Sequence, residues 1–247
     1  DLIVDQVLVI DRSRSMSTSI GDFTRIEAAR AAAQLFVDAS GSDDQIGVVR
    51  FNGDKTEPGG GIIDDADVLY SLQAMNSQFE RDVVNLIIDE SNPTGDKLEP
   101  QGQTSIGDGL YMAAGEIVTN GNSVAEPWII LLSDGHQNED SAYEDHSSVF
   151  SLLGIKIETI ALGSGADKNL LQQIATDTSG RFYDVTEPSG GASPSSRGVD
   201  RSPTSTSGGE PVETASSYGS IMLDLVDRFM LTSDRIQRRE RLREVSG

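Results

Sequence analysis

Cysteine is absent from the 247 residues of the chain. Without thiols the protein has no disulfides, no zinc–thiolate site and no cysteine nucleophile. This absence leaves the compartment open, because many secreted microbial proteins also lack cysteine. Long hydrophobic runs are missing too, and none approaches the roughly 18 to 20 residues of a membrane-spanning helix. We therefore expect no insertion of this chain into a membrane.

Basic residues are scarce, with 19 Lys and Arg against 40 Asp and Glu, for a net charge of −21. Such an acidic chain repels phosphate backbones, which argues against nucleic-acid binding and favours a cation or a cationic partner. The apolar fraction of 36% is enough for one large α/β domain with an appendage, which we favour over two small domains. Because the sequence starts at Asp1 without Met, we expect it to be cut from a longer protein.

A short apolar run near the N-terminus ends in an acidic residue. In QVLVIDRSRS, residues 6–15, oxygen-bearing side chains occupy alternate positions at Asp11, Ser13 and Ser15. The run is typical of a buried parallel strand that delivers a carboxylate to the C-terminal edge of a sheet. Open α/β sheets bind their ligands at that edge.

Two later segments place oxygen ligands after similar elements. Thr104 lies in GQTSIGDGL, at the start of a helical pattern, and Asp134 closes the apolar run of WIILLSDG. Loops that follow neighbouring strands converge where the strand order reverses, so these segments are able to meet. Hydroxyl and carboxylate oxygens suit Mg²⁺, Ca²⁺ or Mn²⁺ rather than zinc or copper. We hypothesise one hard-cation site made of Asp11, Ser13, Ser15, Thr104 and Asp134.

Apolar spacing and capping signals alternate between strand and helix along the chain. Three capping boxes, Thr24-x-x-Glu27, Ser77-x-x-Glu80 and Ser141-x-x-Glu144, mark helix starts. The expected helices cover about 24–40, 77–92, 105–120, 141–153 and 167–178, and the expected strands 6–11, 45–51, 66–69, 128–133, 155–162 and 181–185. This order predicts a doubly wound, mostly parallel α/β sheet with helices on both faces.

Two of these elements carry more specific expectations. We expect 66–69 to be a short edge strand guarded by acidic residues. In the helix after Ser77, the spacing predicts one apolar face made of Phe79, Val83, Leu86 and Ile87.

The composition changes at Glu187. Residues 188–217 consist mostly of Ser, Gly, Pro and Thr, which predicts a flexible insertion rather than a domain. Apolar spacing returns between Ile221 and Phe229 and predicts a closing helix. We therefore expect one domain over 1–232, followed by an Arg-rich extension over 233–247.

The three motifs together resemble the metal-ion-dependent adhesion site of von Willebrand factor type A domains, in that family's order and over about residues 3–232. The resemblance implies that Ser13, Ser15 and Thr104 coordinate the ion directly or nearly so. It further implies that Asp11 and Asp134 act through water, and that a carboxylate of a partner protein completes the octahedron. The LLSDG segment and the later FYDV strand are similar to the branches of calcium-activated chloride channel regulators and microbial surface proteins.

Arg14 departs from the family pattern, which usually has Gly at this position. A cationic side chain beside the ion puts the affinity of the site in question more than its geometry.

Each motif also has an ordinary structural interpretation. Asp11, Ser13 and Ser15 alone are compatible with a polar turn, and Thr104 alone is more typical of a helix N-cap. His136 is interpreted as an exposed loop residue, and the sequence contains no G-x-S-x-G nucleophile elbow.

Our leading hypothesis is a divalent-cation-dependent protein-binding module for adhesion or assembly, without enzymatic activity. We expect it to be monomeric alone, to bind a partner that presents Asp or Glu, and to be extracellular or on the cell surface, with the cytoplasm as the alternative. The rivals are a hydrolase or phosphoryl-transfer enzyme that uses the same cation as a Lewis acid, and a degenerate scaffold that binds no metal.

Overall fold

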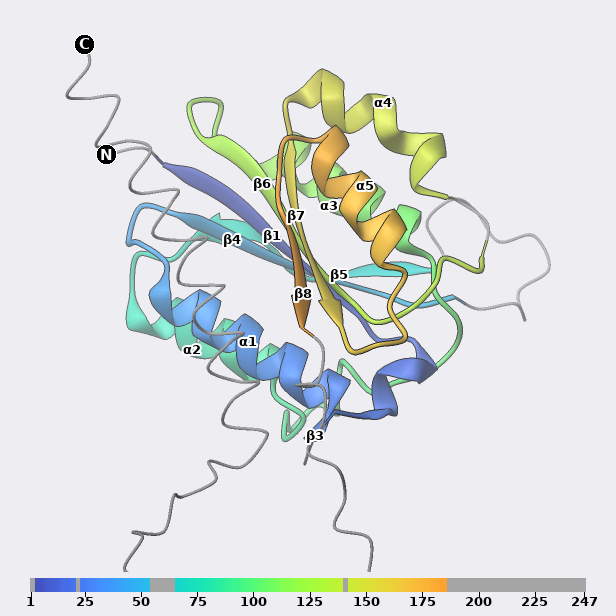
Figure 1. The fold of residues 1–247 in the computed structure, drawn as a ribbon. Helices are drawn as coiled ribbons and strands as arrows, with labels where there is room; N and C mark the ends of the chain where they lie inside the picture. The colour runs from blue at the N-terminus through green and yellow to red at the C-terminus, as the bar shows by residue number, and fades with distance from the viewer. Residues whose placement is uncertain (1–2, 21–22, 54–64, 140–141, 186–247) are drawn as a thin grey trace, which may run out of the picture.

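The computed structural model describes residues 3–20, 23–53, 65–139 and 142–185 (Figure 1). Its main sheet has six strands in the order β5-β4-β1-β6-β7-β8, and β2 and β3 form a separate antiparallel pair. The strands are β1 (Val4–Asp11), β2 (Ser19–Ile20), β3 (Phe23–Thr24), β4 (Gln45–Phe51), β5 (Ala66–Ala74), β6 (Glu126–Ser133), β7 (Lys156–Leu162) and β8 (Phe182–Val185). All pairings in the main sheet are parallel except that of β4 with β5. The predicted mostly parallel α/β fold is confirmed.

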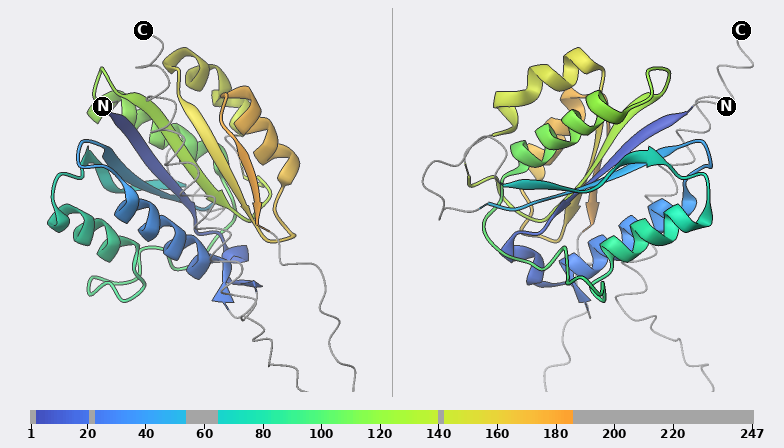
Figure 2. Two further views of the ribbon diagram at one scale, coloured as in Figure 1. Left: turned by 60° about the vertical axis from the view of Figure 1, so that its left-hand side comes forward. Right: turned by 180° about the vertical axis from the view of Figure 1, so that it is seen from behind.

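Helices cover both faces of the sheet (Figure 2). Helices α1 and α2 lie on one face, and α3, α4 and α5 lie on the other. The helical elements are η1 (Arg14–Ser17), α1 (Arg25–Ala39), α2 (Gln78–Ile88), α3 (Ile106–Asn120), α4 (Tyr143–Leu153) and α5 (Lys168–Asp177). Successive side chains of a strand point to opposite faces, so Leu8 and Ile10 pack with α1, and Val7 and Val9 pack with α3. Because helices cover both faces of the sheet, both faces of β1 are buried, and this strand needs a continuous apolar run.

The strand order reverses at β1. This strand pairs in parallel with β4 on one side and with β6 on the other, and Ile10 lies opposite Leu132. The chain leaves β1 toward β4 and later returns to β6, so the loops after β1 and β6 diverge from one point of the sheet edge. In doubly wound sheets, this switch point is where ligands bind.

The starts of α1 and α2 follow the predicted capping boxes. The Thr24 side chain accepts a hydrogen bond from the Glu27 amide, and the Glu27 carboxylate accepts one from the Thr24 amide. Ser77 accepts from the Glu80 amide in the same way. The start of α4 differs, because the helix begins at Tyr143 and the Asp145 carboxylate accepts from the Ala142 amide. Ser141, the predicted cap, lies outside the described residues.

Two expectations about surface elements are wrong. The edge strand β5 runs from Ala66 to Ala74 and is longer than predicted, because its antiparallel pairing leaves alternate residues exposed and weakens the apolar signal. In α2 the buried residues are Val84 and Ile88, whereas Phe79 and Leu86 are 74% and 45% exposed. The helix has apolar residues around most of its circumference, so spacing alone did not select the face that packs against α1 and the sheet.

The predicted insertion at 188–217, the closing helix at 221–229 and the Arg-rich extension at 233–247 all lie outside the described residues. Among the helices that are described, none is both long and apolar enough to cross a membrane.

Candidate metal centre

Asp11, the last residue of β1, is fully buried at the switch point. Its Oδ1 accepts a 2.7 Å hydrogen bond from the Ser13 amide, and its Oδ2 accepts one of 2.6 Å from the Ser133 hydroxyl. The first contact comes from the loop that follows β1, and the second comes from the neighbouring strand β6. The carboxylate is therefore held in one orientation by two elements that are far apart in the sequence.

Ser13, Ser15 and Asp134 form a continuous chain of polar contacts. The hydroxyls of Ser13 and Ser15 lie 3.0 Å apart, and the Ser15 hydroxyl donates a 2.8 Å hydrogen bond to Asp134 Oδ1. The turn η1, which begins at Arg14, directs Ser15 back toward the loop after β6. Four of the five predicted metal ligands are thus joined through direct hydrogen bonds.

Thr104, the fifth predicted ligand, is buried against the loop that follows β6. A Cβ atom at Gly135 would lie only 2.7 Å from Thr104 Oγ1, so the hydroxyl packs directly on the residue after Asp134. Two hydrogen bonds with Asn138 fix the Thr104 backbone: its amide donates to Asn138 Oδ1 at 2.9 Å, and its carbonyl accepts from the Asn138 amide at 3.1 Å. The structure therefore brings all three predicted segments together.

Thr104 is not the N-cap of α3. That position belongs to Ser105, whose hydroxyl donates to the Asp108 carboxylate at 2.7 Å. The helix-cap interpretation of Thr104 is wrong, because the helix begins one residue later than that interpretation requires.

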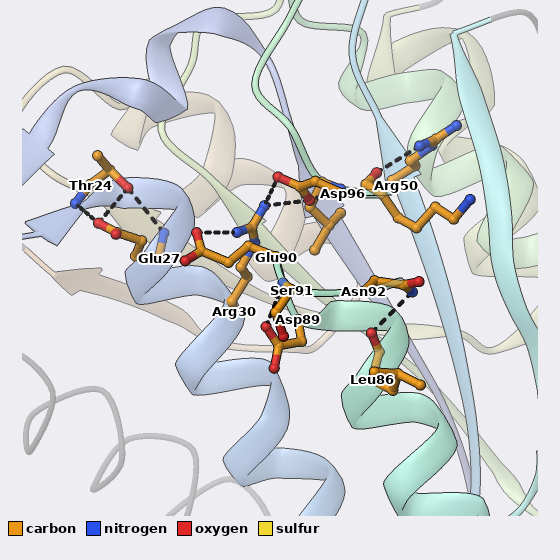
Figure 3. Close-up of polar contacts among 12 residues, drawn as sticks. Thr24, Glu27, Arg30, Arg50, Leu86, Asp89, Glu90, Ser91, Asn92 and Asp96 are labelled. Carbon is orange, nitrogen blue, oxygen red and sulfur yellow. Dashed lines mark hydrogen bonds and ion pairs between the residues drawn. The ribbon is translucent and has the colours of Figure 1, made fainter. Parts of the chain in front are cut away.

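The segment that leads to Thr104 is tied to the loop after β1 and to helix α1. The Gln101 amide donates to the Arg12 carbonyl at 2.7 Å, and the Arg14 amide donates to the Gly102 carbonyl at 3.3 Å. Earlier in the segment, the Arg30 guanidinium on α1 contacts both oxygens of Asp96 at 2.6 Å (Figure 3). These contacts fix the position from which the Thr104 side chain enters the site.

The site concentrates negative charge away from solvent. Burial, together with the nearby charge of Asp134, raises the pKa of Asp11 to about 7, although hydrogen bonds from Ser133 and Ser13 lower it in part. The donors are two carboxylates and three hydroxyls, all of which are oxygen ligands. Among the described residues no group of three or more His, Cys, Asp or Glu side chains has metal-binding geometry. The residues present therefore fit a hard divalent cation rather than a zinc site of the His and Cys type.

Two residues that contact the carboxylates of Asp11 and Asp134 were missed from the sequence. Arg25, the first residue of α1, forms an ion pair through Nη1 with Asp134 Oδ2. No signal in the sequence identified it, because a basic residue at the start of a helix is usually exposed. Ser133 had a signal, since it directly precedes Asp134 at the end of β6.

The rim of the site carries exposed basic side chains. Arg14 is exposed on η1, so it departs from the family pattern without entering the buried network. The His136 side chain is 68% exposed, and its Nδ1 lies 3.0 Å from Asp167 Oδ2. The interpretation of His136 as an exposed loop residue is confirmed.

Known proteins share this fold. The protein BatB from Bacteroides thetaiotaomicron is 18% identical with a TM-score of 0.57, and the match covers 74% of this chain and 90% of that chain. Proximal thread matrix protein 1 from the mussel byssus, solved with a zinc-occupied MIDAS motif, is 26% identical with a TM-score of 0.56 over 74% of this chain and 41% of that chain. The pilus adhesin SpaC from Lactobacillus rhamnosus GG is 15% identical with a TM-score of 0.53, over 74% and 28%. The matched region thus spans less than half of the length of the mussel protein and of SpaC.

The search of curated protein sequences found no match. The family described as von Willebrand factor type A domain matches residues 5–193, which is well over half of the chain and includes all three site segments. This protein therefore belongs to the von Willebrand factor type A domain family.

Proposed function

We propose that this domain is a divalent-cation-dependent protein-binding module for adhesion or assembly. Ser13, Ser15 and Thr104 would hold Mg²⁺, or Ca²⁺ or Mn²⁺ in its place, while Asp11 and Asp134 act through water. The observation that carries the proposal is the hydrogen-bonded network from Asp11 to Asp134 at the switch point of the sheet. It gathers only hard oxygen donors, in the place where this class of fold binds ligands.

The proposed partner is a protein that presents Asp or Glu. If the protein atoms nearest the ion are three neutral hydroxyls, the divalent charge is poorly neutralised and the ion favours an anionic oxygen from outside. The exposed Arg14 side chain lies on the rim and suits the same ligand charge, in a chain that is otherwise strongly acidic.

Family membership supports this proposal, because von Willebrand factor type A domains often mediate metal-dependent protein interactions. Two of the similar proteins also agree with it: one was solved with an occupied metal site, and the other is a pilus adhesin. On this basis we propose an extracellular or surface location, and a domain that is monomeric in isolation. The all-oxygen donor set leads us to favour Mg²⁺, Ca²⁺ or Mn²⁺ over the zinc of the mussel protein.

We propose no catalytic role for the site. A hydrolase would need a base placed beside the attacking group. The imidazole closest in sequence to the site, that of His136, is largely exposed and contacts Asp167, as is typical of a surface residue.

Isothermal titration calorimetry of the full chain with MgCl₂, CaCl₂ and MnCl₂ tests the proposal. We expect binding by wild type, and at least a tenfold loss of affinity in Ser13→Ala and Thr104→Ala, which is about 1.4 kcal/mol per variant. Ser147→Ala on the exposed surface of α4 is the control and should bind as wild type. No binding of any of the three ions at millimolar concentration would select the scaffold alternative. Mg²⁺-dependent turnover of phosphate or ester substrates that is lost in Asp11→Ala would select the enzyme.

A further inference from the structure

Both carboxylate oxygens of Asp134 are engaged within the protein. Oδ1 accepts from the Ser15 hydroxyl, and Oδ2 is paired with Arg25 Nη1. The Asp134 side chain is fully buried, and the Arg25 side chain is only 12% exposed. The guanidinium is therefore an internal cation located at the proposed metal site.

The fold provides a specific place for this guanidinium in the loop between β7 and α5. Gly163 has a φ of 85°, which favours glycine, and a Cβ atom there would lie 2.8 Å from Arg25 Nε. A Cβ atom at Gly165 would lie 3.6 Å from Arg25 Nη1. The capping box of Thr24 and Glu27 fixes the first turn of α1, from which Arg25 extends. Arg25 is thus positioned by two separate segments, the loop after β7 and the first turn of α1, in addition to its ion pair with Asp134.

Within the described part of the chain, the Arg25 guanidinium nevertheless makes few polar contacts. Its Nε is buried and makes no hydrogen bond to any of the described residues. By contrast, the Arg30 guanidinium on the same helix contacts the carboxylates of both Glu90 and Asp96 (Figure 3). Among the described residues, the ion pair with Asp134 is consequently the main electrostatic restraint on Arg25, and a cation that draws the Asp134 carboxylate toward itself weakens that restraint.

A divalent ion at the proposed site would be attracted to Asp134, the same carboxylate that pairs with the Arg25 guanidinium. When both are ionised, Asp11 and Asp134 supply two negative charges, which act on a divalent ion through water and so offset its charge only in part. If Arg25 stayed in place, three positive charges would face two negative ones in a buried region, where Coulomb repulsion is weakly screened. We infer that Arg25 competes with the metal ion for Asp134 and thereby sets the affinity of the site for the ion. This inference rests on the proposed function, because it assumes that the site binds a divalent cation.

The test is calorimetric titration of the full chain with MgCl₂ and MnCl₂. Arg25→Met removes the charge but keeps a long apolar side chain, and we expect it to bind both ions at least about tenfold more tightly than wild type. Arg25→Lys keeps the charge and should remain near the wild-type affinity. Arg81→Met is the matched control, because the Arg81 guanidinium donates to the carbonyls of Ser40 and Met75, at the other end of α1. This control should not change metal affinity.

Two outcomes separate this inference from the proposed function. If wild type binds the ions and Arg25→Met binds equally or more weakly, Arg25 does not compete and the inference is overturned, while the metal site stands. If no variant binds either ion, the proposed function fails and the inference fails with it.

A second measurement keeps the inference testable if Arg25→Met does not fold. The arginine Nε–Hε signal of Arg25 in wild type, assigned by its absence in Arg25→Lys, should change on addition of MgCl₂ as the guanidinium leaves Asp134. A signal that is unaltered at saturating Mg²⁺ would contradict competition.

Discussion

Ser133 donates a 2.6 Å hydrogen bond to Asp11 across the two adjacent strands at the switch point. Both residues are fully buried, so water is not available to replace the contact. The bond links the carboxyl ends of β1 and β6 and orients the Asp11 carboxylate toward the loop that holds Ser13. Ser133 is thus part of the site although its hydroxyl is not one of the predicted ligands.

Replacing Ser133 with Ala should lower the free energy of unfolding by about 1–3 kcal/mol, because a buried carboxylate oxygen loses its donor. Urea unfolding at neutral pH without metal measures the effect. Ser147→Ala removes an exposed helical hydroxyl and should stay within about 0.5 kcal/mol of wild type. Equal stability of the two variants would show that the bond between Ser133 and Asp11 contributes nothing.

Gly135→Ala should weaken Mg²⁺ binding about tenfold, because the added Cβ lies 2.7 Å from Thr104 Oγ1 and must displace that hydroxyl. Calorimetric titration measures the change. Gly115→Ala on α3 is the control, because a Cβ there meets no atom within 4 Å. It should leave binding unchanged and stabilise the helix by about 0.5–1 kcal/mol. Wild-type affinity in Gly135→Ala would place Thr104 outside the metal site.

Arg14→Gly, which restores the usual family residue, should change Mg²⁺ affinity by less than about threefold at physiological salt. The Arg14 side chain is exposed, so solvent and salt screen its repulsion of the ion. Calorimetry on the two proteins at low and physiological salt checks this. A larger change that persists at physiological salt would mean that Arg14 acts on the buried network.

The Asp5 carboxyl lies at the end of β1 opposite the site, and it should make the free energy of unfolding depend on pH. Burial raises the pKa of Asp5 to about 6, and the nearby charge of Asp44 contributes to this increase. A hydrogen bond from the Asn122 amide to the carboxylate lowers the pKa in part. The ordinary value is 3.8, so the folded protein holds this proton more tightly than the unfolded chain does. This carboxyl therefore reduces stability as the pH rises from about 4 to 6, and the cost is complete above pH 6.

Asp5→Asn should accordingly be more stable than wild type by about 2–3 kcal/mol at pH 7, and the difference should vanish below about pH 4. The amide keeps an oxygen that accepts from the Asn122 amide. Urea unfolding of both proteins at several pH values between 3.5 and 7.5 measures the difference, which is about 1.4 kcal/mol for each unit of pKa change. A difference that does not vary with pH would contradict the shifted carboxyl.

The sequence alone determined the parallel strands of the sheet and the composition of the site. The apolar runs that become β1 and β6, with the capping boxes of α1 and α2, are local signals, because strand burial and helix capping depend on residues close in the chain. The ligand types followed directly, since Asp11 and Asp134 end their runs. Local signals failed for the buried face of α2, which depends on what packs against it.

Only the tertiary structure decided how the site is held. It joined Ser15 to Asp134 across 119 positions, placed Thr104 on Gly135, and brought Arg25 to the Asp134 carboxylate. The motifs predicted that the segments of Ser15, Thr104 and Asp134 meet, but not these individual contacts, because each contact depends on how loops from non-consecutive elements pack at one edge of the sheet. Residue identity therefore set the charge and chemistry available to the site, while the strand order set which charges face one another.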